Sequence, residues 1–148
     1  KAKEFGITGE IIPDLPFEET FIYQELAKKY EQSIITFVSP THSKERIAQV
    51  VKNATKFIYM VAYAGITGSG KSEDLTQVIK TVKENTKTPL YVGFGVDENT
   101  CKEKSVGVDG VIVGSAFVKH IIDDSLSYNE KIDKICKISK EIKEKING

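Results

Sequence analysis

The stretch GVDGVIVGSA, residues 107–116 of this 148-residue sequence, decides the fold class. A turn that begins at Gly107 leads into an uninterrupted apolar run, which ends at Gly114 and Ser115. Continuous apolar runs are typical of parallel strands covered on both faces, whereas half-exposed strands alternate. A similar stretch, GITGEII, occupies residues 6–12, so the chain repeats a turn that leads into a buried strand. The stretch therefore predicts a repeating α/β fold with a parallel sheet.

Outward from this stretch, short apolar runs alternate with amphipathic helical segments about every 25 to 30 residues. The expected strands are residues 9–14, 33–39, 57–63, 90–94 and 110–114. The expected helices are residues 1–5, 17–30, 43–53, 73–85, 98–104, 116–122 and 129–146. A complete (β/α)8 TIM barrel has eight βα units in about 250 residues. We therefore expect a single α/β domain over residues 1–148, a partial TIM barrel of about five βα units.

The charge balance and the rare residue types exclude several classes of function. Lys plus Arg and Asp plus Glu each number 21, and the single arginine is Arg46. Nucleic acids and anionic membranes attract a basic excess, so neither is an expected partner. Cys101 and Cys136 lie far apart without a C-x-x-C pair, which indicates reduced thiols of a cytoplasmic protein. His42 and His120 lack metal-ligand spacing, so we expect no metal site.

Glycines follow the last two expected strands, at the edge of a parallel sheet where ligands bind. Gly95 follows the strand at residues 90–94, and Gly114 ends the strand at 110–114, with Ser115 opening a short helical segment. Glycine lets backbone N–H groups approach an anion closely, and a helix N-terminus adds a positive dipole. Many barrels hold a substrate phosphate in the loops after their last two strands. These residues therefore predict a phosphate site.

A second motif competes with this interpretation. Residues 65–72, GITGSGKS, match every fixed position of the nucleotide-binding pattern G-x-x-x-x-G-K-[ST], with Lys71 as its lysine. A P-loop enzyme also needs an aspartate at a strand end to order Mg²⁺. Asp14 and Asp97 are the candidates, and neither ends an uninterrupted apolar strand. A P-loop NTPase is therefore an alternative function that experiment has to separate from the barrel.

Four motifs match a known family in order and spacing. They are IPDLP at residues 12–16, AGITG at 64–68, VGFG at 92–95 and DGVIVGSA at 109–116. Together they resemble the carboxyl-terminal portion of the tryptophan synthase alpha subunit, strands four to eight of a (β/α)8 barrel, from residue 5 to about residue 122. The resemblance implies a lyase of tryptophan biosynthesis that cleaves indole-3-glycerol phosphate to indole and glyceraldehyde 3-phosphate. It implies no cofactor for this chain, and a hetero-oligomer with the pyridoxal-phosphate-dependent beta subunit, which receives the indole.

The resemblance also implies roles for individual residues. The implied substrate-binding residues are Tyr59, Thr67, Gly68, Phe94, Gly95, Gly114 and Ser115. The three glycines and the serine fall where the family binds the glycerol-phosphate group, and the two aromatic residues fall in the indole pocket. The threonine falls on the mobile loop that closes over the substrate. Backbone amides suit a phosphate dianion and aromatic faces suit an indole ring, so the residue chemistry agrees with these roles.

The catalytic residues are the part of the family pattern that this sequence does not match. In the family a glutamate and an aspartate lie on and just after the second barrel strand. We expect this chain to begin at the end of the third barrel helix, so its catalytic residues are unknown and the chain alone is expected to be inactive. Asp14 falls beside the site, and Ala62 and Tyr63 stand where the family usually has a polar pair such as Ser-Arg. Further alternatives are a phosphoribosyl isomerase barrel and a phosphate-binding module without catalysis.

Overall fold

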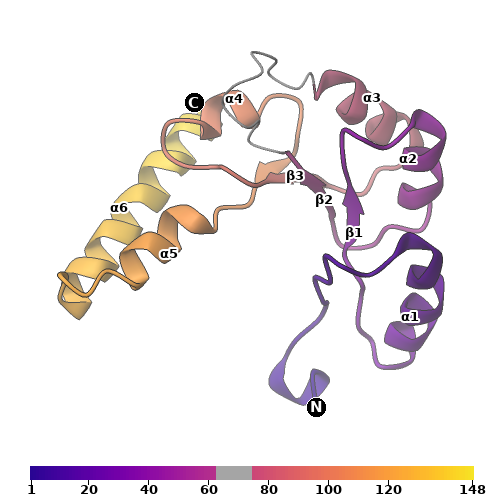
Figure 1. The fold of residues 1–148 in the computed structure, drawn as a ribbon, viewed down its shortest axis with the longest axis horizontal. Coiled ribbons are helices and arrows are strands. Elements are labelled where there is room, and N and C mark those ends of the chain that lie inside the picture. Colours follow the sequence, from indigo (N-terminus) through magenta and orange to yellow (C-terminus); the bar gives the residue numbers. More distant parts are fainter. Residues whose placement is uncertain (63–74) are drawn as a thin grey trace. The chain divides into compact units, whose positions relative to one another are not determined.

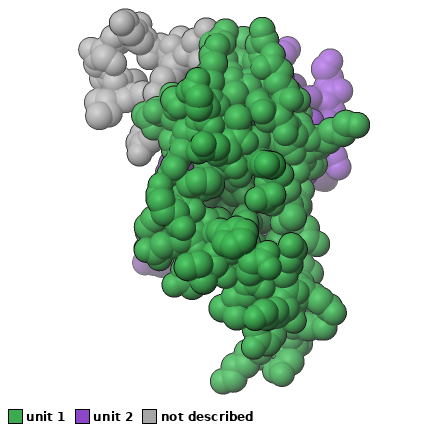
Figure 2. Space-filling model, turned by 90° about the vertical axis from the view of Figure 1, so that its right-hand side faces the viewer, with its two compact units in different colours: residues 1–60, 75–90 green, residues 61–74, 91–148 purple. Residues whose placement is uncertain are grey.

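The computed structural model describes residues 1–62 and 75–148, in which helices alternate with short strands (Figure 1). Two units divide the chain (Figure 2). Unit 1 comprises residues 1–60 and 75–90, and unit 2 comprises residues 61–74 and 91–148.

Four parallel strands are present among the described residues. They are β1 (Thr36–Val38), β2 (Ile58–Val61), β3 (Leu90–Gly93) and β4 (Gly110–Val111). Their order in the sheet is β1-β2-β3-β4. β1 pairs with β2 in parallel, with Thr36 opposite Ile58, and β3 pairs with β4 in parallel, with Tyr91 opposite Gly110. Parallel pairing in sequential order is what consecutive βα units of a barrel produce, and it confirms the predicted α/β class.

The strand predicted at residues 9–14 was wrong in its extent. Only Glu10 pairs there, in an isolated parallel bridge with Ile34, and its N–H donates to Ser33 O at 2.8 Å. Pro13 has no N–H group to continue a ladder of hydrogen bonds. The other four predicted strands form over shorter spans than expected. The described residues therefore contain four strands and one bridge rather than five full strands.

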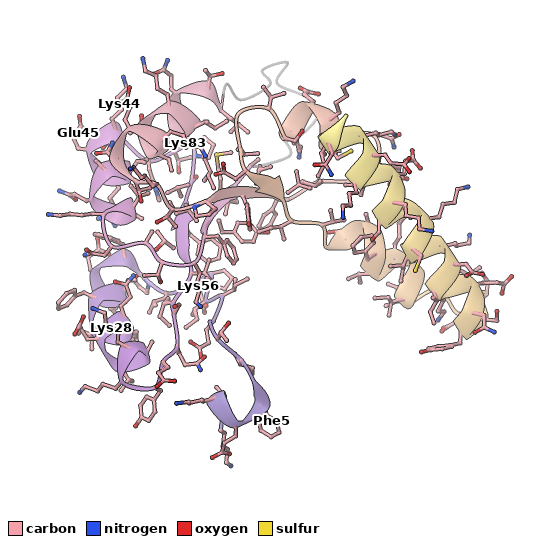
Figure 3. The ribbon with its side chains drawn as sticks, turned by 180° about the vertical axis from the view of Figure 1, so that it is seen from behind. Phe5, Lys28, Lys44, Glu45, Lys56 and Lys83 are labelled. Atoms are coloured by element: carbon pink, nitrogen blue, oxygen red, sulfur yellow. The ribbon has the colours of Figure 1, made fainter. Side chains whose placement is uncertain are left out.

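Unit 1 has four helices among its described residues. They are η1 (Lys3–Phe5), α1 (Phe17–Lys29), α2 (Lys44–Val51) and α3 (Thr76–Asn85). Of these, α2 and α3 contribute several residues to its apolar core. α2 begins after Ser43, whose hydroxyl accepts a hydrogen bond from Arg46 N–H at 3.2 Å. It packs on α3 and β1, while Lys44 and Glu45 are exposed (Figure 3). The largest fully buried side chains of unit 1 are Val38, Ile47, Val51, Ile58, Met60, Val82 and Leu90.

The helices of unit 2 pack around α6. They are α4 (Cys101–Lys104), α5 (Ser115–Ile121) and α6 (Tyr128–Asn147). α6 begins with a capping box, in which Ser127 and Glu130 each bond the backbone N–H of the other with a side-chain oxygen. α6 packs on both α4 and α5. The apolar core of unit 2 consists of Val96, Cys101 and Ile142, with Val111, Val113, Ile138 and Ile146 packed against it. This core fixes the places where the chain leaves β3 and β4.

Candidate functional site

The chain leaves β3 through two residues in the left-handed backbone region. Phe94 has a φ of 74° and Gly95 has a φ of 62°. Glycine adopts this conformation readily, but phenylalanine adopts it at a cost, and such residues cluster at functional sites. The Phe94 side chain is 54% exposed although it is a large aromatic group. The turn therefore presents an aromatic side chain at the carboxyl end of a parallel strand, where barrels bind ligands.

Two side chains from the α4 region bond the carbonyl groups of this turn. Lys104 Nζ donates a hydrogen bond to Phe94 O at 2.6 Å, and Thr100 Oγ1 donates one to Gly95 O at 2.8 Å. Hydrogen bonds from a charged donor are about twice as strong as neutral ones. Burial lowers the pKa of Lys104, and nearby carboxylates offset part of this effect. The conformation of the turn is therefore fixed by residues that follow it by five to ten positions.

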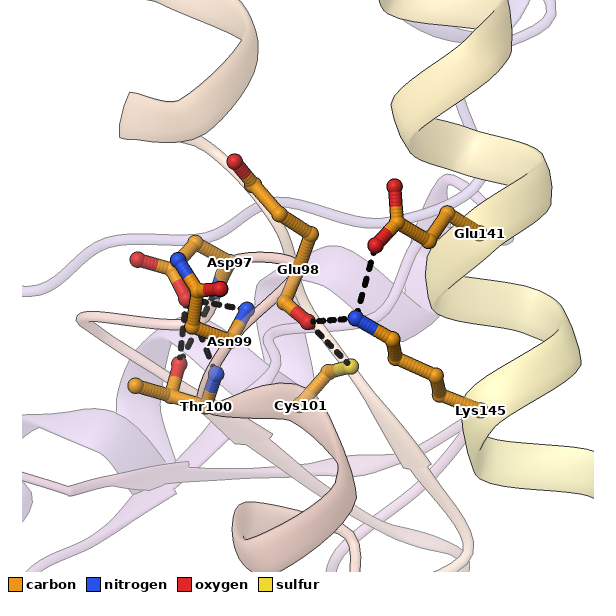
Figure 4. A network of polar contacts seen from close by, with 7 residues as sticks. All are labelled: Asp97, Glu98, Asn99, Thr100, Cys101, Glu141 and Lys145. Atoms are coloured by element: carbon orange, nitrogen blue, oxygen red, sulfur yellow. Dashed lines mark hydrogen bonds and ion pairs between the residues drawn. The ribbon is translucent and has the colours of Figure 1, made fainter.

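The carboxylate of Asp97 organises the loop between the turn and α4 (Figure 4). Its Oδ1 accepts hydrogen bonds from the N–H groups of Asn99 and Thr100, both at 2.9 Å, and from the Thr100 hydroxyl at 3.0 Å. Burial raises the pKa of Asp97, but these hydrogen bonds outweigh burial and hold the pKa below its usual value. Asp97, which the sequence offered as a Mg²⁺ ligand of a P-loop enzyme, is thus engaged as a capping residue of its own loop.

Lys145 connects α6 to the same loop (Figure 4). Its Nζ donates to the backbone oxygen of Glu98 at 2.6 Å and to Glu141 Oε1 at 2.7 Å. The hydrogen bond with Glu141 is the main cause that raises the pKa of Lys145. The thiol of Cys101, which is fully buried, lies 3.8 Å from the same Glu98 oxygen. Cys101 is a buried free thiol and Cys136 is an exposed one.

Gly110, the first residue of β4, and Gly114, which follows the strand, differ in their surroundings. A Cβ atom at Gly110 would lie 3.2 Å from ring atoms of Tyr91, which is closer than ordinary contact. A Cβ atom at Gly114 would meet no atom within 4 Å among the described residues, and the φ of Gly114 is −122°. Neither packing nor a left-handed backbone therefore requires glycine at position 114. Open space beside the backbone is what a ligand that contacts main-chain N–H groups needs.

Gly114 leads directly into α5, which begins at the exposed Ser115. Gly114 O accepts hydrogen bonds from the N–H groups of Phe117 (2.9 Å) and Val118 (3.1 Å), which close the first turn of the helix. The first N–H groups of a helix have no acceptor within it. The amides of residues 115 and 116 and the Ser115 hydroxyl therefore provide hydrogen-bond donors for an anion.

Tyr59, the predicted site residue of unit 1, lies on β2. It is opposite Phe37 of β1 in the sheet register, and the two rings stack with centroids 5.1 Å apart and planes inclined by 21°. Burial raises the pKa of Tyr59, so its hydroxyl is protonated at neutral pH. The stacked pair presents flat apolar surface on one face of the strands.

Five of the seven predicted site residues are described. They are Tyr59, Phe94, Gly95, Gly114 and Ser115. The last four belong to unit 2, and they follow β3 and β4, which pair in parallel, so they leave the sheet at the same end. Thr67 and Gly68, together with the motif at residues 65–72, lie outside the described residues.

Sequence reasoning missed the residues that support the turn after β3. Thr100 and Lys104 bond its carbonyl groups, and neither residue belongs to the four family motifs. A signal for Thr100 was present in the run DENT at residues 97–100, because an aspartate followed by polar residues is typical of a turn capped by the carboxylate. Lys104 carried no such signal.

The described ranges offer neither a cluster of metal ligands nor a membrane-spanning helix. No group of three or more His, Cys, Asp or Glu side chains within residues 1–62 and 75–148 is placed to hold a metal ion. No helix within these ranges is both long and apolar enough to cross a membrane.

Comparison with known proteins gives one consistent result. The family model described as tryptophan synthase alpha chain matches residues 1–147. The tryptophan synthase alpha chain of Wolinella succinogenes is 50% identical over 149 residues, which cover 100% of this chain and 58% of that protein. The one from Methanocaldococcus jannaschii is 39% identical over 89% of this chain and 48% of its own length. The solved tryptophan synthase subunit alpha from Campylobacter jejuni has a TM-score of 0.80 and 37% identity, covering 95% of this chain and 56% of that one. The chain thus spans about half the length of the relatives that it matches.

Proposed function

The chain belongs to the tryptophan synthase alpha chain family, and we propose that it takes part in the lyase reaction of tryptophan biosynthesis. In that reaction indole-3-glycerol phosphate is cleaved to indole and glyceraldehyde 3-phosphate. We assign to this chain the binding of the substrate phosphate and part of the indole pocket. Its catalytic acid and base stay unassigned.

The proposed phosphate site consists of Gly95, Gly114 and Ser115, with Gly68 added by the family resemblance. The observation that carries it is the space beside Gly114, where a Cβ atom would meet no atom of the described residues within 4 Å and the φ of −122° is not left-handed. A phosphate there would accept hydrogen bonds from the first amides of α5 and from the Ser115 hydroxyl. The hydrogen bonds from Lys104 and Thr100 to the turn after β3 support the same site by fixing its backbone in advance.

The charge distribution favours recognition of phosphate by neutral donors. Arg46, the single arginine of the sequence, belongs to unit 1 and bonds Glu18 at 2.7 Å. It also lies over the ring of Phe17, with its guanidinium carbon 4.2 Å from the ring centroid. Because this guanidinium is already bonded, we assign phosphate recognition to backbone amides and a hydroxyl rather than to an arginine clamp.

The family resemblance assigns contact with the indole ring to Tyr59 of unit 1 and, separately, to Phe94 of unit 2. Tyr59 offers a face extended by its stacking on Phe37, and Phe94 is exposed on a turn with a fixed backbone. Flat apolar faces of this kind bind an aromatic ring by stacking or edge contacts. Thr67 would close over the bound substrate.

The proposed partner is the beta subunit of tryptophan synthase, which would receive the indole in a hetero-oligomer. The support for this proposal is the family description, tryptophan synthase alpha chain, because the word alpha implies that the synthase contains at least one other kind of chain. The pyridoxal phosphate of that assembly would be bound by the beta subunit rather than by this chain. The proposed location is the cytoplasm.

Calorimetric titration with glycerol phosphate tests the phosphate site. Gly114→Asp places a carboxylate where the dianion would bind, and repulsion between like charges should weaken binding by at least about a hundredfold. Ser139→Asp, on the exposed side of α6, adds the same charge elsewhere in unit 2 and should leave binding unchanged. Equal losses in the two variants would show that net charge, rather than the site, controls binding.

A mixture of this chain with the amino-terminal part of the Wolinella relative tests the lyase reaction. The mixture should release indole from indole-3-glycerol phosphate, and Gly114→Asp should abolish the release. A titration with Mg·ATP tests the P-loop alternative, because nucleotide binding through residues 65–72 would depend on Lys71. Tight ATP binding that Lys71→Ala removes, with no indole release from the mixture, would replace the proposed function.

A further inference from the structure

The turn after β3 places two successive residues in the left-handed backbone region. Their φ angles are 74° at Phe94 and 62° at Gly95. This conformation costs free energy for a residue with a side chain, because its Cβ atom comes too close to the following carbonyl oxygen. Glycine, asparagine and aspartate adopt it most readily, and phenylalanine is not among them. A phenylalanine keeps such a conformation only where surrounding contacts hold it.

Lys104, the last residue of α4, provides such a contact. Its Nζ donates a hydrogen bond to Phe94 O at 2.6 Å. The lysine is half-buried, and a charged donor forms a stronger hydrogen bond than a neutral one. The Thr100 hydroxyl also bonds the turn, but at Gly95 O, and glycine adopts a left-handed φ without such support. Of the two bonds, the one from Lys104 therefore acts on the strained residue.

The same bond sets the direction of the next N–H group. Phe94 C=O and Gly95 N–H belong to one peptide unit, and the described residues contain no cis peptide bond. In a planar trans peptide the N–H group points away from the C=O group, so fixing one fixes the other. Gly95 is exposed, and because glycine has no side chain, its exposed surface is backbone. Within the described ranges its N–H group donates no hydrogen bond, which leaves it available to a ligand.

We propose that Lys104 is a positioning residue for phosphate binding, which holds Phe94 in the left-handed conformation and thereby orients Gly95 N–H toward a phosphate oxygen. The inference rests on the proposed function, because that function assigns Gly95 to the phosphate site. Lys104 acts through the turn and makes no contact with the substrate. It also lies outside the four motifs that carry the family resemblance, so the motifs alone do not assign this role.

A purely electrostatic role for Lys104 makes a different prediction, and Lys102 separates the two. Lys102 lies on the same helix and is exposed, and its side chain forms no ion pair or hydrogen bond with any described residue. Lys102→Met and Lys104→Met remove the same charge from α4. Only the second change also removes the bond to Phe94 O.

Calorimetric titration of the full chain with glycerol phosphate tests the effect on binding. Lys104→Met keeps most of the apolar stem and should weaken binding at least about fivefold, because a bond from a charged donor is lost. Lys104→Arg keeps a charged donor and should stay within about twofold of wild type, as should Lys102→Met. Binding by Lys104→Met that equals that of wild type would overturn the proposal, and so would equal losses in Lys102→Met and Lys104→Met.

Backbone resonances test the turn itself, without any ligand. Lys104→Met should shift the amide nitrogen of Gly95 and change the φ-dependent coupling between the amide and α protons of Phe94, whereas Lys102→Met should change neither. An unchanged turn in Lys104→Met would overturn the proposal while leaving the proposed function intact. Wild type that binds no glycerol phosphate would instead overturn the proposed phosphate site, and the role of Lys104 with it.

A double-mutant cycle tests the step through Phe94. Asparagine adopts left-handed backbone more readily than phenylalanine, so a turn with Phe94→Asn depends less on an external bond. In the Phe94→Asn background, adding Lys104→Met should weaken glycerol phosphate binding by less than about twofold, compared with at least about fivefold in the wild-type background. Equal losses in the two backgrounds would show that Lys104 does not act by holding Phe94.

Discussion

The turn after β3 in unit 2 and the interior of unit 1 differ in the hydrogen bonding of their polar side chains. In unit 2, Asp97, Thr100 and Lys104 bond one another or the turn after β3. In unit 1, Thr36 and Gln32 are almost fully buried, and each has a side-chain oxygen without a partner among the described residues. A network of bonded groups fixes one geometry before a ligand arrives, whereas an unpaired buried group lowers the stability of the fold. The contrast teaches that the polar groups of an exposed turn can be bonded more completely than polar groups in the interior.

The largest expected effect concerns how firmly each unit holds its helix. Ile142 of α6 is 4% exposed, whereas Ile22 of α1 is 67% exposed. Ile142→Ala removes core packing and should lower the free energy of unfolding by about 3 kcal/mol. Ile22→Ala should change it by less than about 0.5 kcal/mol. Urea unfolding followed by circular dichroism measures both values, and similar losses would mean that α1 is packed as tightly as α6.

The second prediction compares two threonines with opposite hydrogen bonding. Thr100→Val breaks the hydroxyl bonds to Gly95 O and Asp97 Oδ1, and it should cost about 2 kcal/mol in the free energy of unfolding. Thr36→Val replaces an unpaired buried hydroxyl with a methyl group, and it should be neutral or stabilise by up to about 1 kcal/mol. Thermal unfolding of the two variants gives the comparison directly. A destabilised Thr36→Val would indicate that its hydroxyl already has a bonded partner.

The third prediction uses the lowered pKa of Asp97. Its ordinary pKa is 3.8, and a folded-state pKa below that value means that ionised Asp97 stabilises unit 2 above pH 3.8. This contribution is lost as the pH falls through the folded-state pKa. Asp97→Asn should therefore reduce stability at pH 7, and the difference from wild type should shrink toward pH 3. The expected change is below about 1 kcal/mol, because the carboxylate is largely in contact with solvent. Thermal melts between pH 3 and 7 measure it.

The smallest expected effect concerns His42 in unit 1. Its ordinary pKa is 6.5, and burial lowers the folded-state value, so the neutral ring is favoured in the folded chain. Stability from this group is complete above pH 6.5 and is lost as the pH falls toward the folded-state pKa. His42→Leu should remove this part of the pH dependence while leaving that of Asp97 unchanged. A loss of stability in wild type that begins only near pH 4 would contradict the prediction for His42.

The parallel α/β class could be predicted because the evidence for it is local. Continuous apolar runs such as residues 110–114 mark buried strands wherever the partner strand comes from. The extent of the strand at residues 9–14 could not be predicted in the same way. The length of this strand depends on the pairing of Glu10 with Ile34 and on the path of the chain after Pro13. Both are set by tertiary structure rather than by the local sequence.

In the candidate site, too, some features could be predicted from the local sequence and others depend on tertiary contacts. The sequence identifies Gly114 as a residue after a strand, but Gly110 looks equally suitable as a ligand-binding glycine. Only the position of the Tyr91 ring separates the two, because it faces Gly110 and leaves Gly114 open. Likewise, Lys104 reaches Phe94 O only because α4 folds back onto the turn. Tertiary contacts of this kind leave no periodic signal in the sequence.

The labelling rates of the two thiols can report how often unit 2 opens locally. Cys136 is exposed on α6 and should react at once with a thiol reagent, whereas Cys101 is fully buried in the core of unit 2. Cys101 can react only during a transient opening of α4 from α6, so its labelling rate under native conditions reports how often that opening occurs. Wild-type protein thus carries, without any added probe, a fast reference reaction and a slow one. A ligand that stabilises the loop after β3 should slow the labelling of Cys101 and leave the labelling rate of Cys136 unchanged.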